Sequence, residues 1–419
     1  MKYLKYVVLI LVLYLSIIVG VIVFNNTKEV NRQVNLKNYK NNIIKNVKER
    51  YNSVVKTNKD ALIYTLVDGE YIVSGSVYKG RLLSVKDIKI SDRTLYFPVS
   101  NLDGEYFIYY KDVEKSDTLI NNNTRFTNYI PFNENIITSN VTNFYKDGNL
   151  IYSFNKSFSL PIYIKDVNTY GVVYNNELLD VKKEEVKEII YNFNSDKIKA
   201  KNIATLLYHF IYNQDTEKCN EIICHKVSLV RTHLDYLKQN NYFTLTMKEF
   251  EMFIDKKMNL PKNSILLTLD DGGFAHNAKA LFNEYKMNLS MFLVSSWFNP
   301  ADYKTEYTEV HSHTHNMHNT GVCPKGQGGG LQCLNEKTLM EDLAKSRELT
   351  FNTTAISYPF FEFNNYTISV CKKAGFTLGF AGYYGGGSLK AYPGYDKFRI
   401  PRITMLNDTS VNDIKNILE

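Results

Sequence analysis

Two short segments concentrate the side chains best suited to bind a divalent metal ion. In the first, SILLTLDDGG, the carboxylates of Asp270 and Asp271 end a mostly apolar run, and two glycines then permit a sharp turn. In the second, TEVHSHTHNMH, four of the chain's eight histidines fall within eight residues. A catalytic ion of the zinc type takes imidazole and carboxylate ligands and keeps one position open for water. We therefore expect Asp271 and two of these histidines to form a site that activates water.

The spacing of the histidines leaves the choice between them open. One pair is His311 with His315 and the other is His313 with His318; the unused pair would line the pocket or hydrogen-bond to the ligands. Each segment also has an explanation other than a catalytic metal site. The first would be an Asp-Gly turn that caps a helix, and the second a surface tract that scavenges metal. Their occurrence together favours the metal site.

The elements around these segments alternate between strand and helix beyond about residue 200. Such alternation predicts a parallel sheet or barrel covered by helices, with its chemistry at the carboxyl ends of the strands. Thr246 and Glu249 form a capping box that opens one helix. The expected strands are 201–210, 264–270, 289–294, 354–358 and 376–380, and the expected further helices are 227–240, 276–286, 336–349 and 366–373.

The region from about 60 to 185 follows a different pattern. Short apolar and aromatic runs are broken by turns, and Asp-Gly pairs at Asp68, Asp103 and Asp147 are typical of hairpins. This pattern predicts an all-β region. The similar segments LLSVKD and PIYIKD suggest two related units of SH3-like size. Such a region would bind the cell wall or act as a spacer.

The amino-terminal segment is long and apolar enough to cross a membrane. Tyr6 to Phe24 is an uncharged run of 19 residues, and at about 1.5 Å per residue it spans a hydrocarbon core of about 30 Å. No small-x-small cleavage site follows it, so we expect an uncleaved anchor. Lys2 and Lys5 favour a cytoplasmic amino terminus. Apolar positions within 27–57 then predict a helical stalk that leads to domains outside the membrane.

Composition restricts the partners of the chain. At 419 residues it is long enough for two or three domains. The formal charge of +7 is small, and its basic and acidic residues are interleaved, so a nucleic-acid-binding stripe is not indicated. Cys219 can pair with Cys224, and Cys323 with Cys333, each within one loop, as is usual outside the cytoplasm. Cys371 lies in an expected helix and is expected to be buried.

Three motifs together resemble those of the polysaccharide deacetylase family, the NodB-homology carbohydrate esterases of family 4. The motifs are TLDDGG, EVHSHTHNMH and AISYPFFEFN, and the resemblance covers residues 200–405. It implies a distorted (β/α) barrel in which Asp270 is the general base and Asp271 a metal ligand. His313 stands in the family's first histidine position. Members that deacetylate poly-N-acetylglucosamine place the second histidine five residues on, which selects His318.

The sequence departs from the family pattern at two positions. It has no histidine after His318 to act as the general acid, so the resemblance moves that role to His209 in the early motif TLLYHF. Ser357 stands where the family often has an arginine that orients the base, and Arg402 is the candidate to replace it. The resemblance also assigns a backbone oxyanion donor to Phe360. Tyr358, Pro359 and Arg402 are assigned to the substrate site, and Phe361 and Trp297 are candidate platforms for sugar rings.

These expectations combine into one hypothesis. The chain is a metal-dependent N-deacetylase of an N-acetylglucosamine-containing surface polysaccharide, with zinc as the expected ion and cobalt, nickel or iron as alternatives. It is a single-pass protein of the cell membrane with its catalytic domain outside. The alternatives are an inactive or weakly active polysaccharide-binding protein of the envelope and an O-acetyl esterase of the same fold. The expected parts are an anchor (1–26), a stalk (27–58), a β-rich region (59–190) and a catalytic domain (200–419).

Overall fold

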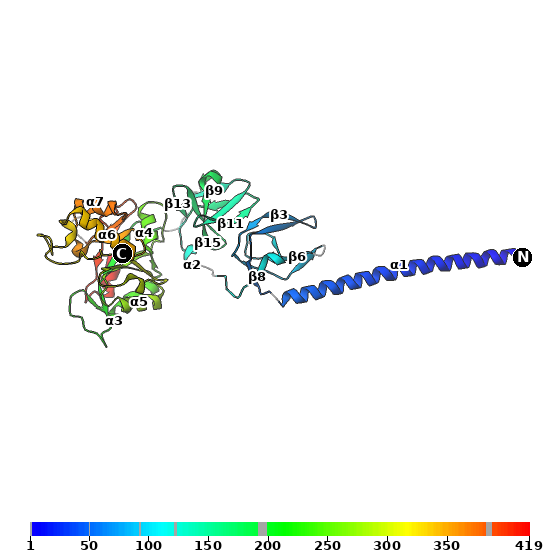
Figure 1. The fold of residues 1–419 in the computed structure, drawn as a ribbon, viewed down its shortest axis with the longest axis horizontal. Helices are drawn as coiled ribbons and strands as arrows, with labels where there is room; N and C mark the ends of the chain where they lie inside the picture. Colours follow the sequence, from blue (N-terminus) through cyan, green and yellow to red (C-terminus); the bar gives the residue numbers. More distant parts are fainter. Residues whose placement is uncertain (1, 50, 92–93, 121–123, 192–198, 383–387) are drawn as a thin grey trace. The chain divides into compact units, whose positions relative to one another are not determined.

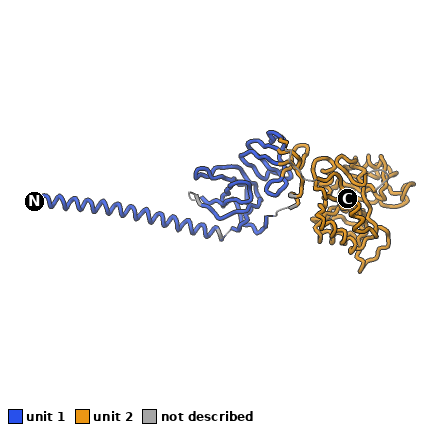
Figure 2. The backbone as a smooth tube through the Cα atoms, turned by 180° about the vertical axis from the view of Figure 1, so that it is seen from behind, with its two compact units in different colours: residues 1–124, 136–160, 173–189 blue, residues 125–135, 161–172, 190–419 orange. Residues whose placement is uncertain are grey.

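A computed structural model describes residues 2–49, 51–91, 94–120, 124–191, 199–382 and 388–419. The chain divides into two compact units, coloured blue and orange in Figure 2. Unit 1 comprises residues 1–124, 136–160 and 173–189, and unit 2 comprises 125–135, 161–172 and 190–419. Two short stretches of the β-rich region therefore pack with unit 2.

Helix α1 opens unit 1 and runs without interruption over Lys2–Lys48 (Figure 1). Its most apolar part has a mean hydropathy of 3.3 over 18 residues, and the apolar side chains there are exposed. By length and composition, this helix could cross a membrane. The stalk was expected to stay helical to residue 57, which is wrong. The β-branched pair Val54 and Val55 instead joins strand β1.

The rest of unit 1, with adjoining segments of unit 2, is built from short antiparallel strands. Figure 1 shows these strands as blue to green arrows. Asp68, Asp103 and Asp147 each lie between two paired antiparallel strands, as the Asp-Gly signals predicted. One continuous path of paired strands joins both halves of the region, because β11 pairs with β3. The strands are β1 Val54–Thr57, β2 Ala61–Val67, β3 Glu70–Val77, β4 Leu82–Ser84, β5 Lys89–Ser91, β6 Thr94–Val99, β7 Tyr106–Tyr109, β8 Val113–Lys115, β9 Glu134–Thr138, β10 Thr142–Lys146, β11 Asn149–Phe154, β12 Ser159–Pro161, β13 Ile164–Lys165, β14 Thr169–Tyr174, β15 Glu177–Lys182 and β16 Val186–Tyr191.

Unit 2 is a mixed α/β fold around a mostly parallel sheet. Its central order is β25-β24-β23-β22-β21-β17-β26. The sheet is curled, since Phe380 at one edge bridges to Ile400, and the nearby β27 pairs with β17 toward the other edge. The strands are β17 Ile203–Tyr208, β18 Phe210–Tyr212, β19 Cys224–Lys226, β20 Phe243–Thr244, β21 Ser264–Asp271, β22 Leu289–Leu293, β23 Thr308–Ser312, β24 Ala355–Ser357, β25 Leu378–Phe380, β26 Lys390–Ala391 and β27 Ile403–Thr404.

Helices pack on this sheet through apolar faces. One core cluster joins Val230 and Leu234 of α3 and Phe282 of α5 to Leu267 and Leu269 of β21, and all five side chains are fully buried. The capping box predicted at the start of α4 is present. The helices predicted from periodicity match closely, and α8 was not predicted. The helices are α3 Val227–Gln239, α4 Met247–Ile254, α5 Ala275–Tyr285, α6 Glu336–Leu349, α7 Asn365–Lys373 and α8 Val411–Leu418.

Candidate metal centre

Strand β21 brings two carboxylates to the carboxyl edge of the parallel sheet. Every residue of β21 is buried, because β17 and β22 flank it and run parallel to it. Such a strand needs an almost continuous apolar sequence, so Asp270 and Asp271 mark its end. Gly272 follows with a φ of 107°, and a Cβ there would lie 2.6 Å from the ring of Phe298. The turn after the carboxylates therefore requires glycine.

Asp271, His313 and His318 converge into one cluster. Oδ1 of Asp271 lies 3.2 Å from Nε2 of His313 and 3.1 Å from Nε2 of His318. The three potential ligand atoms all lie within 4.8 Å of one another. Burial opposes ionisation of Asp271, but hydrogen bonds from the two imidazoles hold the pKa of its carboxyl well below the usual range. One carboxylate and two imidazoles suit a divalent ion of the zinc type and leave room for water.

A hydrogen bond at Nδ1 of His313 determines which nitrogen of its ring can bind an ion. Nδ1 of His313 lies 2.9 Å from the carbonyl oxygen of Ser357. A carbonyl only accepts, so Nδ1 carries a proton, and Nε2, which faces Asp271, is the nitrogen left to bind an ion. His311 and His315 bond elsewhere, through contacts of Nδ1 with Thr353 at 2.7 Å and Ser295 at 3.0 Å respectively. The geometry thus brings together His313 and His318 and leaves the other pair outside the cluster.

Asp270 lies beside the cluster and is held by a buried arginine. Nη1 and Nη2 of Arg402 lie 2.7 Å and 2.8 Å from the two carboxylate oxygens, a bidentate pair between fully buried side chains. The hydroxyl of Ser357 donates to Asp270 at 2.8 Å and accepts from Arg402 at 2.8 Å. Burial alone would raise the pKa of Asp270, but Arg402, together with His313 and His209, outweighs burial and lowers that pKa. Asp270 is therefore ionised at neutral pH.

His209 stands at the same edge of the sheet. It follows β17, whose last residue Tyr208 is in register with Leu269, so His209 comes level with Asp270. The side chain is 9% exposed, and no described residue accepts or donates a hydrogen bond at Nδ1. Burial lowers the pKa of His209, while the carboxylates of Asp270 and Asp271 oppose that effect. The imidazole therefore lies within the field of both carboxylates and keeps one nitrogen unpartnered.

Aromatic side chains lie against His318. The ring of Phe360 packs 4.2 Å from the imidazole, and its backbone is left-handed, with a φ of 57°. The indole of Trp297 lies 5.3 Å away on the same histidine and is 49% exposed. These rings restrict the orientation of His318. Trp297 also gives the site an accessible aromatic surface, which Phe361 shares only in part because it is half-buried.

Comparison with known proteins places this site in a family. The sequence profile of the family described as polysaccharide deacetylase matches residues 257–379. A poly-beta-1,6-N-acetyl-D-glucosamine N-deacetylase of Staphylococcus aureus (strain MRSA252) is 30% identical over 237 residues, covering 51% of this chain and 78% of that protein. The chain belongs to the polysaccharide deacetylase family. The similarly named protein of Staphylococcus epidermidis is 25% identical over 44% of this chain and 69% of its own length.

Solved structures also resemble this polysaccharide deacetylase. A de-N-acetylase from Aggregatibacter actinomycetemcomitans aligns with 51% of this chain and 99% of its own, with 19% identity and a TM-score of 0.45. A deacetylase from Streptococcus pyogenes, solved with acetate, aligns with 52% and 98%, with 19% identity and a TM-score of 0.43.

Two residues expected to bind the substrate of this polysaccharide deacetylase are fully buried. Tyr358 is fully buried, and its hydroxyl donates to the carbonyl of Phe398 at 3.1 Å. Arg402 is also fully buried, between the rings of Phe292 and Phe361. Neither side chain presents a surface to a substrate, so their assignment to substrate binding is wrong. Arg402 instead holds Asp270, the second role expected of it. Pro359 is buried as well.

One residue outside the predicted set holds the loop that carries the histidines. Asp342 of α6 accepts hydrogen bonds from the backbone N–H groups of His315, at 2.9 Å, and Asn316, at 2.7 Å. Burial nevertheless raises the pKa of its carboxyl. A detectable signal existed, because Asp342 falls on the buried face of α6 beside Leu339 and Leu343.

Both predicted disulfides are present, and Cys371 is a buried free thiol.

Proposed function

We propose that the chain is a metal-dependent N-deacetylase of an N-acetylglucosamine-containing polysaccharide. The observation that carries the proposal is that two adjacent carboxylates have different partners. Asp271 faces His313 and His318, whereas Asp270 is turned to Arg402 and Ser357. The similarity to a protein named poly-beta-1,6-N-acetyl-D-glucosamine N-deacetylase, over 78% of its length, supports the choice of substrate class.

The ion would be held by Asp271, His313 and His318, with zinc as the first candidate. A bound ion of this type lowers the pKa of a coordinated water and polarises a carbonyl. Asp270 is the proposed general base. Arg402 and Ser357 fix both of its oxygens, so the carboxylate is oriented before the substrate arrives. The pair with Arg402 also keeps it ionised and ready to take a proton.

His209 is the proposed general acid. Amide hydrolysis needs a proton on the leaving nitrogen, and an imidazole at the edge of the site is the group suited to deliver it. The backbone N–H of Phe360 is the proposed donor to the oxyanion. Trp297 offers an exposed ring for a sugar face. Deacetylation at this site would release acetate and leave a glucosamine unit in the polymer.

The proposal extends to architecture and location. The curled sheet of unit 2 would be the distorted (β/α) barrel of the NodB-homology fold, and the β-rich region would be SH3-like. Helix α1 would cross the cell membrane once and hold residues 200–419 outside. The two disulfides agree with an oxidising location.

An assay of acetate release tests the proposed chemistry. The full chain in detergent should release acetate from β-1,6-linked N-acetylglucosamine oligomers. Asp270→Asn should lower the rate about 10²-fold or more, since a positioned general base contributes about 10²–10⁴-fold. Asp255→Asn, a partly exposed carboxylate that binds Lys397, is the matched control and should retain the rate. Full activity of Asp270→Asn would exclude Asp270 as the base.

A further inference from the structure

An aromatic cluster lies beside the glycine turn that follows the carboxylates of β21. It consists of Phe210, Tyr212 and Phe274, whose side chains are all half-buried. The ring of Phe210 covers Gly273, because a Cβ on this glycine would lie 2.6 Å from Cδ1 of that ring. The ring centroids of Tyr212 and Phe274 lie 6.4 Å apart. The aromatic cluster therefore adjoins the edge of the sheet that carries the carboxylates.

The strand order places this cluster and Trp297 on opposite sides of the carboxylates. Strand β21 pairs with β17 on one side and with β22 on the other, and all three strands run parallel. Phe210 follows shortly after β17, whereas Trp297 follows shortly after β22. Neighbouring strands are about 4.8 Å apart, so about 10 Å separates β17 from β22. This span is wider than one pyranose ring, so a substrate that contacts both sides has more than one sugar unit.

The three rings are not part of the neighbouring core. The core cluster contains Ile211, which stands between Phe210 and Tyr212 in the chain, and Ala275, which follows Phe274, but it contains none of the three rings. The apolar side chains that are packed against this core from outside do not include them either. Core packing therefore does not account for the aromatic cluster.

The backbone of Phe274 also departs from what its side chain prefers. Its φ is 57° and its ψ is 20°, a left-handed conformation that is unfavourable for a bulky residue and that recurs at functional sites. The residue precedes α5 as its N-cap, but its side chain makes no capping hydrogen bond. Neither helix capping nor backbone preference explains a phenylalanine here, which leaves the contacts of its ring.

Polar bonds and a disulfide hold β18, the strand that carries the other two rings. The side-chain amide of Asn277 donates to the carbonyl of Ile211 at 3.1 Å and to the carboxylate of Glu217 at 2.7 Å. Strand β18 also pairs with β19, which begins at the disulfide between Cys219 and Cys224. The rings are thus positioned before a ligand binds, which lowers the entropy cost of binding.

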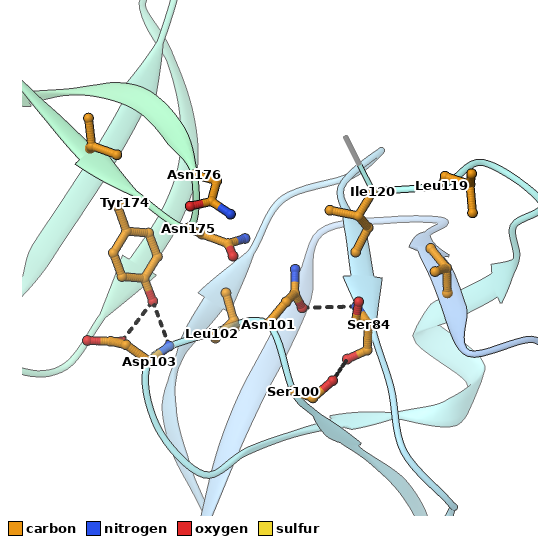
Figure 3. A pocket seen from close by; sticks show the side chains of 12 residues that line it. Ser84, Ser100, Asn101, Leu102, Asp103, Leu119, Ile120, Tyr174, Asn175 and Asn176 are labelled. Carbon is orange, nitrogen blue, oxygen red and sulfur yellow. Dashed lines mark hydrogen bonds between the residues drawn. The ribbon is translucent and has the colours of Figure 1, made fainter. Parts of the chain in front are cut away.

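The hydroxyl of Tyr212 is available to a ligand. Its oxygen is not buried, and it has no hydrogen-bond partner among the residues that the structure describes. The cavity of unit 1 in Figure 3 differs in this respect, because the hydroxyl of Tyr174 there donates to Asp103 at 2.9 Å. The aromatic cluster therefore combines ring faces with one hydroxyl that can bond to a polar ligand.

We infer that the aromatic cluster is a binding subsite for a sugar unit next to the unit that loses its acetyl group. The inference rests on the proposed function. A pyranose presents C–H groups on its faces, which pack on aromatic rings, and hydroxyls at its rim, which the hydroxyl of Tyr212 can bond. With Trp297 on the other side of the carboxylates, the substrate chain lies across the carboxyl edge of the sheet. The site therefore selects oligomers over single sugars.

Steady-state acetate release by the full chain in detergent tests the inference. The substrates are a β-1,6-linked N-acetylglucosamine hexamer and the N-acetylglucosamine monomer. Phe274→Asn removes one ring and accepts the left-handed backbone, and Tyr212→Ala removes another. Each should raise KM for the hexamer about tenfold and leave kcat within about twofold, because contacts made equally in the ground and transition states change KM alone. Neither should change kcat/KM for the monomer, which cannot occupy the metal centre and the subsite together.

The matched control is Tyr242→Ala. It removes a half-buried ring that packs on Tyr236, beside the residue that pairs with the first residue of β21. This is the amino end of the strand, opposite to the carboxylates. The control should change the kinetics of neither substrate.

Two outcomes would overturn the inference. One is a hexamer KM that neither Phe274→Asn nor Tyr212→Ala raises. The other is an equal loss of activity on both substrates, because the rings would then support the glycine turn rather than bind a neighbouring sugar. Acetate release by the wild-type chain separates this inference from the proposed function. Release from the hexamer with no effect of either variant refutes the inference alone, whereas a wild-type chain that releases no acetate refutes both.

Discussion

Replacing Arg402 by glutamine should destabilise unit 2 and change how its stability depends on pH. Arg402 forms two hydrogen bonds with Asp270 at 2.7 Å and 2.8 Å, and both side chains are at most 2% exposed. Removal of one partner from a buried pair costs about 3–5 kcal/mol, because the other charge stays buried without compensation. The hydroxyl of Ser357 at 2.8 Å and the imidazole of His313 at 3.9 Å still face Asp270. We therefore expect the substitution to lower the free energy of unfolding by about 3 kcal/mol, the lower end of that range.

The sign of the pH dependence follows from the pKa of Asp270. In the wild-type chain Arg402 holds that pKa below the ordinary value. The pair therefore stabilises the fold above the unfolded pKa of about 3.9, and this contribution is lost as the pH falls through the lower folded value. Without Arg402, burial dominates and raises the pKa of Asp270. Protonation of Asp270 near pH 4 then removes the buried charge and reduces the loss of stability in the variant. The difference in stability between the two proteins should be largest at pH 7 and should narrow toward pH 4.

Thermal unfolding followed by circular dichroism measures this difference. About 3 kcal/mol corresponds to about 6–12 °C in Tm for a unit of this size. Arg399→Gln is the matched control, because Arg399 lies three residues away and is 46% exposed in a surface pair with Asp396. Such a pair contributes about 0–1 kcal/mol. Equal Tm values for the two variants at pH 7 would refute the reasoning. A difference in Tm between the wild type and Arg402→Gln that widens on acidification would refute it as well.

The remaining predictions concern three other positions. His209→Ala should lower acetate release about 10²–10⁴-fold with its metal content unchanged, and wild-type turnover would exclude His209 as the acid. Asp342→Asn keeps one acceptor for the N–H groups of His315 and Asn316 but loses the second, so metal affinity should fall about tenfold in a chelator competition. An unchanged affinity would show that Asp342 does not position the ligands. Cys323→Ser with Cys333→Ser opens a loop with a sequence separation of 10 residues and should lower stability by about 2–4 kcal/mol in denaturant unfolding. A loss below about 0.5 kcal/mol would show that the bridge does not constrain this loop.

The sequence predicted the parts of the site that local patterns control. The apolar run of β21 ends in carboxylates, and the amphipathic periods of α3 and α6 produced helices close to the expected ranges. These features depend on near neighbours in the chain. The choice of His313 and His318 from four histidines came from the family resemblance, and spacing alone left it open. Only the fold shows that His311 and His315 bond away from the cluster.

Contacts between distant segments could not be derived from patterns. Arg402 and Asp270 are 132 residues apart, and no periodicity links them. The full burial of Tyr358 also depends on packing against Phe363 and on the carbonyl of Phe398, in segments with no recognisable pairing signal. In unit 1, the β region was predicted from composition and turns. The pairing of β11 with β3, which joins the two halves of that region, could not be predicted because it links segments far apart in the chain.

Metal content measured together with acetate release tests the central claim most directly. The full chain should bind about one zinc-type ion, lose activity with a chelator and regain it when zinc is restored. His313→Ala with His318→Ala should abolish both the bound ion and acetate release. The exposed His276→Ala should change neither. Retention of the ion by the double variant, or full activity of the chelated chain, would contradict the assignment of Asp271, His313 and His318 as the metal centre.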